Sequence, residues 1–329
     1  MALTIYKEAD VTALQDRRIA ILGYGNQGRA HALNLRDSGL DVVIGQRPGK
    51  GRDQAKADGF SPISLADAAS TADLAILTLP DESAADIYNE TIASALGTRA
   101  TLGFVHGFNI RFGFIKPPET TDIIMIAPKG PGTLLRSLYL EGKGLPSLLA
   151  VHQDAGGTAK ATALAWAAGI GAIRAGVIET TFACETETDL FGEQVALCGG
   201  LTALTKAAFE TLVEAGYEPE FAYLECVHEL KQVADLLYTR GLSGMRDAIS
   251  NTAEYGDLTR GPRLITDQTR QEMKKILEEI RSGAFAKEWM DEHRAGSKNL
   301  KRLYDKDADS PYEKAGEAVR SLMPWLTDA

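Results

Sequence analysis

Residues 18–28 have the sequence RIAILGYGNQG, and this stretch decides the fold of the first half of the chain. Its apolar run predicts a buried strand that ends at Gly23. Gly25 and Gly28 complete a G-x-G-x-x-G pattern, and the segment 28–38 predicts a helix. A strand, a glycine-rich turn and a helix in this order are typical of a dinucleotide-binding unit, whose helix N-terminus faces a pyrophosphate. The alternative is a glycine-rich turn that binds no ligand.

Further short apolar runs alternate with helix-like segments, such as 64–70, up to about residue 180. Each run is flanked by turn residues and is of strand length. Alternating strands and helices predict parallel β-α-β units and a doubly wound sheet. The additional predicted strands are Val42–Ile44, Leu74–Leu79, Thr101–Val105, Ile123–Ala127 and Leu148–Val151.

The second half has a different sequence pattern, because runs of β-branched residues become scarce after about Thr181. Long amphipathic stretches replace them and predict helices. We therefore predict two domains: an α/β Rossmann-type domain with a doubly wound parallel sheet over 1–182, and an all-α domain over 183–329. The predicted helices lie within 190–215, 219–238, 266–281 and 312–322.

Composition excludes some classes of partner. The chain has 329 residues and a formal net charge of -10, which argues against a nucleic-acid-binding surface. Its three cysteines form no C-x-x-C pair, as expected for reduced thiols in a cytosolic protein. The N-terminal segment has no apolar signal core, and no apolar stretch approaches the roughly 20 residues of a membrane span. We expect a cytoplasmic protein without membrane or nucleic-acid partners.

The loop after the second predicted strand bears on cofactor choice. An NAD-specific site usually has an acidic residue at this strand end, where this chain has Gln46. Arg47, Lys50 and Arg52 could neutralise a 2′-phosphate, whereas Asp53 would repel it. The basic residues could equally form a solvated loop. The balance favours NADP(H) and leaves NADH open.

Two acidic pairs occur in the helical half. Asp189 and Glu193 are four residues apart, as are Glu225 and Glu229, so each pair would share one helix face. Carboxylate oxygens suit Mg²⁺, and four of them could hold two ions. The alternative is a pair of solvated acidic faces. His228 beside Glu229 could be a ligand or a packing residue.

At these residues the chain resembles the short, class I ketol-acid reductoisomerases. Several motifs carry the resemblance, in order and over nearly the whole chain. They are G-Y-G-N-Q-G at Gly23, H-G-F-N-I at His106, A-P-K-G-P-G at Ala127, A-V-H-Q-D at Ala150, E-T-D-L-F-G-E-Q at Glu187, E-C-V-H-E at Glu225, S-N-T-A-E-Y-G-D at Ser250 and M-P-W-L at Met323.

The resemblance implies roles for individual residues. His106, Lys129 and Glu229 would be catalytic, and Ser250 would bind the substrate carboxylate. Two Mg²⁺ ions would be held by Asp189, Glu193, Glu225 and Glu229, the last two from a neighbouring subunit. The cofactor contacts would include Tyr24, Gly25, Asn26, Gln27, Asp81, Glu82, Ser83, Ala84 and Gly132, beside the loop residues Arg47, Lys50, Arg52 and Asp53.

The resemblance also implies an activity and an assembly. The substrates would be 2-acetolactate and 2-aceto-2-hydroxybutyrate, which undergo alkyl migration and hydride reduction to 2,3-dihydroxy-3-methyl acids in valine and isoleucine biosynthesis. The protein would be a homodimer or a larger homo-oligomer with an intersubunit active site and a knotted helical domain. Two alternatives remain: a metal-independent β-hydroxyacid-type dehydrogenase, and a nucleotide sensor without turnover.

The chain departs from the family pattern at three places. The loop after the second strand has Gly51 and Arg52 where serines commonly bind the 2′-phosphate, which leaves NADH use open. Asn26 stands where serine is usual in the glycine loop, and Thr133 where histidine is usual after A-P-K-G-P-G. The change at Asn26 is modest, and we expect little effect from the change at Thr133.

Overall fold

The computed structural model describes residues 3–326 and divides into two compact units, Met1–Thr188 and Asp189–Ala329. The break lies six residues beyond the predicted boundary at 182/183. Helix α8 (Phe182–Gly192) crosses it, and its first turns pack with the first unit through Phe182, Glu185 and Thr186, which are buried.

The first unit is built on an eight-stranded sheet with the order β1-β8-β7-β6-β5-β4-β2-β3. The doubly wound α/β fold is confirmed, and each predicted strand is present within one or two residues of its expected ends. The short strands β1 and β8 were not predicted. The strands are β1 (Ile5–Tyr6), β2 (Arg18–Leu22), β3 (Asp41–Gly45), β4 (Leu74–Leu77), β5 (Thr101–Phe104), β6 (Ile123–Pro128), β7 (Ser147–Gln153) and β8 (Val177–Glu179).

The sheet is mixed rather than fully parallel, because β7 runs antiparallel to β6 and β1 runs antiparallel to β8. Pro128 at the end of β6 lies opposite Ser147 at the start of β7. The intervening helix α6 (Gly132–Leu140) packs on α1 (Asn26–Asp37), and the chain re-enters the sheet at the same strand ends where β6 left it. A parallel crossover would instead have to bring the chain back to the opposite ends of the strands.

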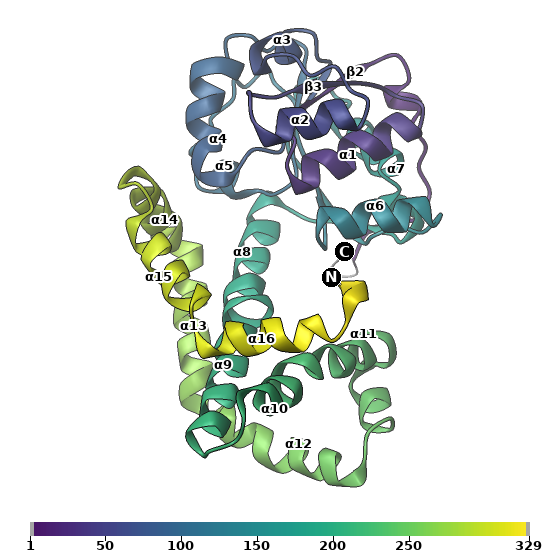
Figure 1. The fold of residues 1–329 in the computed structure, drawn as a ribbon. Helices are drawn as coiled ribbons and strands as arrows, with labels where there is room; N and C mark the ends of the chain where they lie inside the picture. The colour runs from purple at the N-terminus through teal and green to yellow at the C-terminus, as the bar shows by residue number, and fades with distance from the viewer. Residues whose placement is uncertain (1–2, 327–329) are drawn as a thin grey trace. The chain divides into compact units, whose positions relative to one another are not determined.

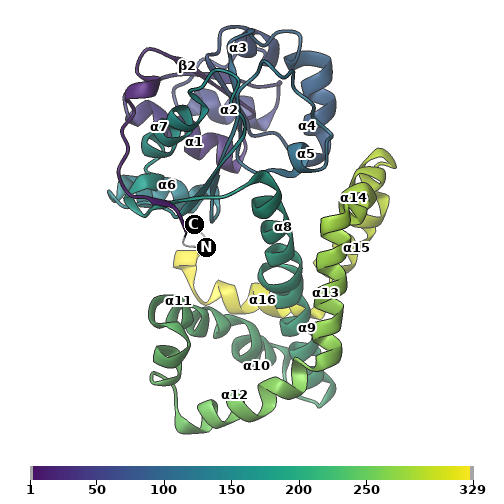
Figure 2. The ribbon, with the colours of Figure 1, turned by 180° about the vertical axis from the view of Figure 1, so that it is seen from behind.

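Helices cover both faces of this sheet, as Figure 1 and Figure 2 show from opposite sides. Successive residues of each strand lie alternately in two separate hydrophobic cores, one on each face of the sheet, as expected for strands buried on both faces. One face packs against α1, α6 and α7 (Ala159–Gly169), with Ala55 of α2 (Lys50–Ala57). The other packs against α3 (Leu65–Ser70) and α4 (Asp81–Ile87), with residues of η2 (Tyr88–Ile92) and α5 (Phe108–Arg111).

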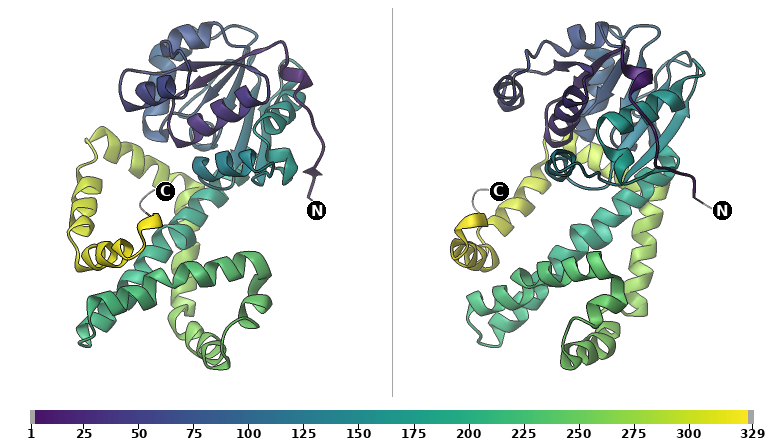
Figure 3. Two further views of the ribbon diagram at one scale, coloured as in Figure 1. Left: turned by 45° about the vertical axis from the view of Figure 1, so that its right-hand side comes forward. Right: turned by 90° about the vertical axis from the view of Figure 1, so that its right-hand side faces the viewer.

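Among its described residues, the second unit is wholly helical, and two of its predicted helices are interrupted. Each contains a π-turn, η4 (Glu193–Leu197) or η5 (Leu224–His228). Three helices within 251–308 were not predicted. The last helix packs on α9 and α10 (Figure 3). The helices are α9 (Gly199–Glu214), α10 (Pro219–Tyr223), α11 (Leu230–Arg246), α12 (Asn251–Leu264), α13 (Asp267–Ser282), α14 (Ala284–Arg294), α15 (Lys298–Ala308) and α16 (Pro311–Ser321).

One helical run within residues 3–326, Phe182–Glu214, is long and apolar enough to cross a membrane by length and composition alone. The expectation that no stretch would approach this length was therefore wrong. Core helices of soluble proteins meet the same criterion. Only 11% of the most apolar 18-residue stretch of this run is buried, and Leu197, Leu201 and Leu204 are exposed.

A buried histidine lies between α1 and α7. His31 is fully buried, and its Nδ1 accepts a hydrogen bond from Trp166 Nε1 at 3.0 Å. The proton of the neutral ring must then be on Nε2, which has no hydrogen-bond partner among the described residues. Burial lowers the pKa of His31 to about 3.

The native state should therefore lose stability on acidification. Because the folded pKa of His31 lies below the unfolded value, the unfolded chain takes up this proton first as the pH falls below about 6.5. One such group costs about 1.4 kcal/mol per pH unit. His31→Gln keeps an acceptor for Trp166 but does not titrate. We expect urea unfolding between pH 6.5 and 4.5 to show a shallower loss of stability for H31Q than for the wild type. Equal slopes would exclude His31 as the source.

Candidate active site

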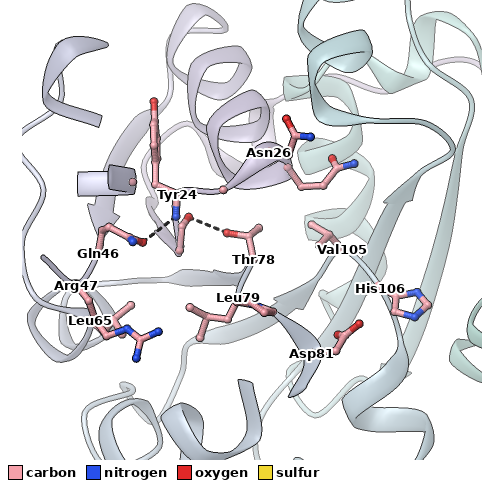
Figure 4. Close-up of a pocket in the computed structure, with 15 residues that line it drawn as sticks. Tyr24, Asn26, Gln46, Arg47, Leu65, Thr78, Leu79, Asp81, Val105 and His106 are labelled. Carbon is pink, nitrogen blue, oxygen red and sulfur yellow. Dashed lines mark hydrogen bonds between the residues drawn. The ribbon is translucent and has the colours of Figure 1, made fainter. Parts of the chain in front are cut away.

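A cavity of about 530 Å³ lies in the first unit, where the carboxyl ends of β2, β4 and β5 meet (Figure 4). This is the place where open α/β sheets bind nucleotides. The predicted glycine loop forms one wall. Its lining residues are Gly23, Tyr24, Gly25, Asn26, Gln27, Gln46, Arg47, Gly51, Leu65, Thr78, Leu79, Pro80, Asp81, Val105 and His106.

The glycine loop is held against the end of β4. Thr78 Oγ1 donates a hydrogen bond to the carbonyl of Gly23 at 2.8 Å. Gly23 has φ +108°, and a Cβ there would lie 2.7 Å from the carbonyl oxygen of Thr78. Only glycine fits this approach. Helix α1 then begins at Asn26, so its first backbone N–H groups are available to an anion.

A second loop, from the A-P-K-G-P-G motif, lies directly against the first. A Cβ on Gly132 would lie 2.1 Å from the carbonyl oxygen of Asn26. Gln27 Nε2 donates to the carbonyl of Gly130 at 3.0 Å, while Gln27 Oε1 is buried with no protein partner among residues 3–326. The N-termini of α1 and α6 thus lie side by side.

Tyr24 contributes to the cavity through its backbone. In Figure 4 its side chain points away from Asp81 and His106. The hydroxyl donates to Asp58 Oδ2 at 2.9 Å, and Asp58 also binds Arg29. Burial, together with the hydrogen bond to Asp58, raises the pKa of Tyr24. The ring therefore anchors the loop to the end of α2.

The cofactor-loop residues lie in different surroundings. Arg47 is exposed and lines the cavity, whereas Lys50 and Asp53 are exposed on the first turn of α2. Arg52 is only partly exposed, and its guanidinium donates to backbone carbonyls. Gln46 Oε1 accepts from the backbone N–H of Tyr24 at 2.8 Å, a contact that we did not predict.

The predicted turn after β4 forms the first residues of α4. Asp81 lines the cavity, and its carbonyl accepts a hydrogen bond from Asn109 Nδ2 at 3.1 Å. Glu82 and Ser83 are partly exposed, while Ala84 is buried in the core. The H-G-F-N-I segment therefore fixes the start of this helix.

The central residue of the site is Glu185, which was not predicted from the sequence. It is 1% exposed. Its carboxylate accepts hydrogen bonds from Lys129 Nζ at 2.9 Å and from the backbone N–H of Gly107 at 3.0 Å, and it lies 3.2 Å from His106 Nδ1. The structure thus joins two predicted catalytic residues through a third. A signal was available, since Glu185 precedes Asp189 by four residues and so shares its helix face.

Glu185 stays ionised although it is buried. Burial alone would raise its pKa, but the hydrogen bonds and charges of His106 and Lys129 outweigh that effect and lower the pKa to about 2. A buried carboxylate is tolerated when such donors surround it. The pair of Lys129 and Glu185 can therefore hold a proton on the lysine nitrogen beside the cavity that His106 lines.

Gly107 allows α8 to approach the end of β5. A Cβ on Gly107 would lie 2.3 Å from Thr186 Oγ1 and 3.0 Å from the carbonyl oxygen of Phe182. The backbone angle φ of Gly107 is one that any residue can adopt, so the requirement for glycine comes from packing alone. This explains the glycine in the H-G-F motif.

Three of the four predicted metal ligands lie on or beside a π-turn, and the fourth, Asp189, lies in α8. Asp189 follows Glu185 by one turn of α8, and candidate ligand oxygens of these two residues lie within 4.8 Å of each other. Glu193 begins η4, while Glu225 lies in η5 and Glu229 follows it. π-turns occur often at functional sites. Within residues 3–326 of one chain, no three of the four predicted carboxylates form a metal-sized group.

Ser250 is the N-cap of α12. Its hydroxyl accepts a hydrogen bond from the backbone N–H of Ala253 at 3.2 Å. The residue is exposed, at a helix end that attracts carboxylates.

Comparisons with known proteins agree with this geometry. Residues 13–176 match the family model of the acetohydroxy acid isomeroreductase NADPH-binding domain, and residues 182–325 match the ketol-acid reductoisomerase C-terminal domain. The chain belongs to the ketol-acid reductoisomerase family.

A solved structure supports the same assignment, and a second one supports the fold. An NADH-preferring ketol-acid reductoisomerase from an uncultured archaeon is 43% identical, covers 98% of this chain and 99% of its own, and superposes with a TM-score of 0.95. An NAD-binding semialdehyde dehydrogenase protein from Cupriavidus necator is 20% identical over 82% of this chain and 99% of its own, with a TM-score of 0.62. The second similarity shows the fold alone.

Membership of the ketol-acid reductoisomerases decides between the alternatives left open by the sequence. The protein is an NAD(P)-dependent oxidoreductase, and neither a β-hydroxyacid-type dehydrogenase nor a nucleotide sensor is needed to explain it. The individual site residues stay predictions, supported by the geometry described above.

The packing of α8 on Gly107 can be tested by mutation. Gly107→Ala should lower the free energy of unfolding by about 1–3 kcal/mol, because the added methyl group overlaps Thr186. Gly97→Ala is the matched control, since a Cβ there meets no atom within 4 Å. Chemical denaturation should show a change below about 0.5 kcal/mol for the control, and partial recovery in G107A/T186A. Equal effects of G107A and G97A would contradict the close approach.

Proposed function

We propose that this ketol-acid reductoisomerase depends on Mg²⁺ and converts 2-acetolactate and 2-aceto-2-hydroxybutyrate into 2,3-dihydroxy-3-methyl acids. The reaction comprises an alkyl migration followed by a reduction. The observation that carries the proposal is the group that the buried Glu185 carboxylate forms with Lys129 and His106 beside the nucleotide cavity. Lys129 offers a proton and Glu185 offers a carboxylate of fixed position, close to where the substrate oxygens would bind.

The predicted ligand set fits magnesium chemically. Asp189, Glu193, Glu225 and Glu229 offer only carboxylate oxygens, the donors that Mg²⁺ prefers. When bound, two such ions supply Lewis acids that lower the pKa of the substrate hydroxyl and polarise its carbonyl. Glu185 orients Lys129 through a hydrogen bond, and Lys129 and Glu229 are residue types that can exchange the substrate proton.

The remaining groups orient the reactants. Ser250 and the N-terminus of α12 offer a hydroxyl and backbone N–H groups to the substrate carboxylate. The N-termini of α1 and α6 offer N–H groups to the cofactor pyrophosphate. The strand end at Gln46 has no carboxylate for a ribose 2′-hydroxyl, and Arg47 lies at the cavity, so we propose NADPH as the preferred reductant with NADH as a weaker one.

Steady-state oxidation of NADPH and NADH with 2-acetolactate tests this function. We expect turnover only with Mg²⁺, its loss in excess EDTA and its recovery when Mg²⁺ is restored. The kcat/KM should be higher with NADPH. Turnover that persists in EDTA would contradict metal dependence, and a higher kcat/KM with NADH would contradict only the cofactor preference.

We also propose that the active site is shared between two copies of the chain in a homodimer or larger homo-oligomer. Two observations support this. No three of the four predicted ligand carboxylates form one metal-sized group within residues 3–326 of a single chain. The second unit also exposes many large apolar side chains, which a second copy would cover. They include Leu197, Leu204, Phe221, Leu237, Leu242, Tyr255, Leu258 and Leu264.

Mixing two inactive variants tests the shared site. D189N and E229Q should each be inactive as homodimers. After denaturation and joint refolding, random pairing makes half of the dimers mixed, and each mixed dimer has one site with all its ligands. About a quarter of the wild-type kcat should return. No recovery in mixed dimers isolated by affinity tags would show that each chain builds its own site.

A further inference from the structure

We infer that Arg52 is a positioning residue of the cofactor site, and that its guanidinium holds the loop after β3 rather than a cofactor phosphate. The inference rests on the proposed use of NADPH and NADH, and it separates Arg52 from Arg47 in the same loop by what their side chains already bind.

The guanidinium of Arg52 is engaged with backbone carbonyls. Nη1 donates to the carbonyls of Gln46 at 2.8 Å and Ile63 at 3.4 Å, and Nη2 donates to that of Pro62 at 2.7 Å. These contacts use three of the five N–H donors that an arginine has. They join the end of β3 to the segment before α3.

The carbonyls depend on Arg52 because few other donors reach them. The Ile63 carbonyl accepts from the Gln46 N–H, but neither the Gln46 nor the Pro62 carbonyl has another donor among the described residues. If Arg52 turned toward a phosphate, these carbonyls would lose their partner, which is costly where they are shielded from water.

The contact reaches the glycine loop through Gln46. Arg52 binds the Gln46 carbonyl, and the Gln46 side chain accepts from the backbone N–H of Tyr24. A Cβ on Gly51 would lie 2.9 Å from Gln46 Nε2, so the chain here is closely packed. Arg52 therefore sets the position of a residue that supports the pyrophosphate loop, a requirement common to both cofactors.

Arg47 is different. It is exposed, and its side chain has no hydrogen bond or ion pair within residues 3–326. It borders both the 530 Å³ cavity and an adjoining cavity of about 730 Å³. Arg52 also borders the second cavity, but with its guanidinium already bound to carbonyls. Arg47 is thus the arginine free to meet a 2′-phosphate.

Cofactor binding to the full-length protein, without substrate or Mg²⁺, separates the two arginines. Dissociation constants for NADPH and NADH are measured by nicotinamide fluorescence for the wild type, R52A, R52K and R47A. R52A should weaken both cofactors alike, by about tenfold, so that the ratio of the two constants stays within about twofold of the wild type. R47A should weaken NADPH alone by about tenfold to a hundredfold.

Kinetics provide a second readout that a purely structural role would not move. In R52A the KM should rise for both cofactors while kcat is kept, and R52K should recover part of the loss because its ammonium can reach one carbonyl. If R52A does not fold, the same ratio measured for R52K decides the question.

A loss of NADPH binding of tenfold or more in R52A or R52K, with NADH binding unchanged, would overturn the inference and make Arg52 a phosphate ligand. A wild type that binds NADH more tightly would contradict only the proposed preference. A folded wild type that binds neither cofactor would overturn both.

Discussion

The buried carboxylate of Glu185 is the interaction on which the arrangement of the site depends. Taking a carboxylate out of water is costly, and here Lys129 and the backbone N–H of Gly107 compensate it, with His106 at 3.2 Å. These groups follow β5 and β6, so the first turns of α8 must dock at the carboxyl edge of the sheet. Gly107 permits that approach, since any side chain would meet Thr186. The same helix then carries Asp189 four residues further on.

The nucleotide cavity rests on a second constraint of the same kind. Gly23 and Gly132 bring backbone within contact of Thr78 and Asn26, so the N-termini of α1 and α6 lie close together. Glycine here does not serve flexibility. It removes atoms where two segments must touch, and each such contact fixes one loop relative to another. The cavity is preorganised by packing, which reduces the cost of ordering it when a ligand binds.

The sequence predicted the fold well where the signal was local. The strand and glycine loop at 18–28 follow from apolar runs and turn chemistry, and they were confirmed. The antiparallel β7 was not predictable, because its direction depends on how α6 packs on α1. Glu185 was missed for a related reason: residue type cannot show burial, and its partners lie 56 and 79 residues away. The two π-turns were not predicted either, because the helical periodicity of apolar residues assumes a regular α-helix.

The loop after β3 shows the limit of assigning roles from charge. Three basic residues within six positions suggest one function, a phosphate site. Their hydrogen bonds divide them, because Arg52 is held by carbonyls while Arg47 has no partner among the described residues. The same holds for Tyr24, whose hydroxyl is already bound to Asp58, so that its backbone rather than its side chain faces the cavity. A polar side chain is available to a ligand only to the extent that the fold has not already used its donors. In this loop, the arginine that remains available to a cofactor phosphate is therefore Arg47, whose side-chain donors are unused within residues 3–326.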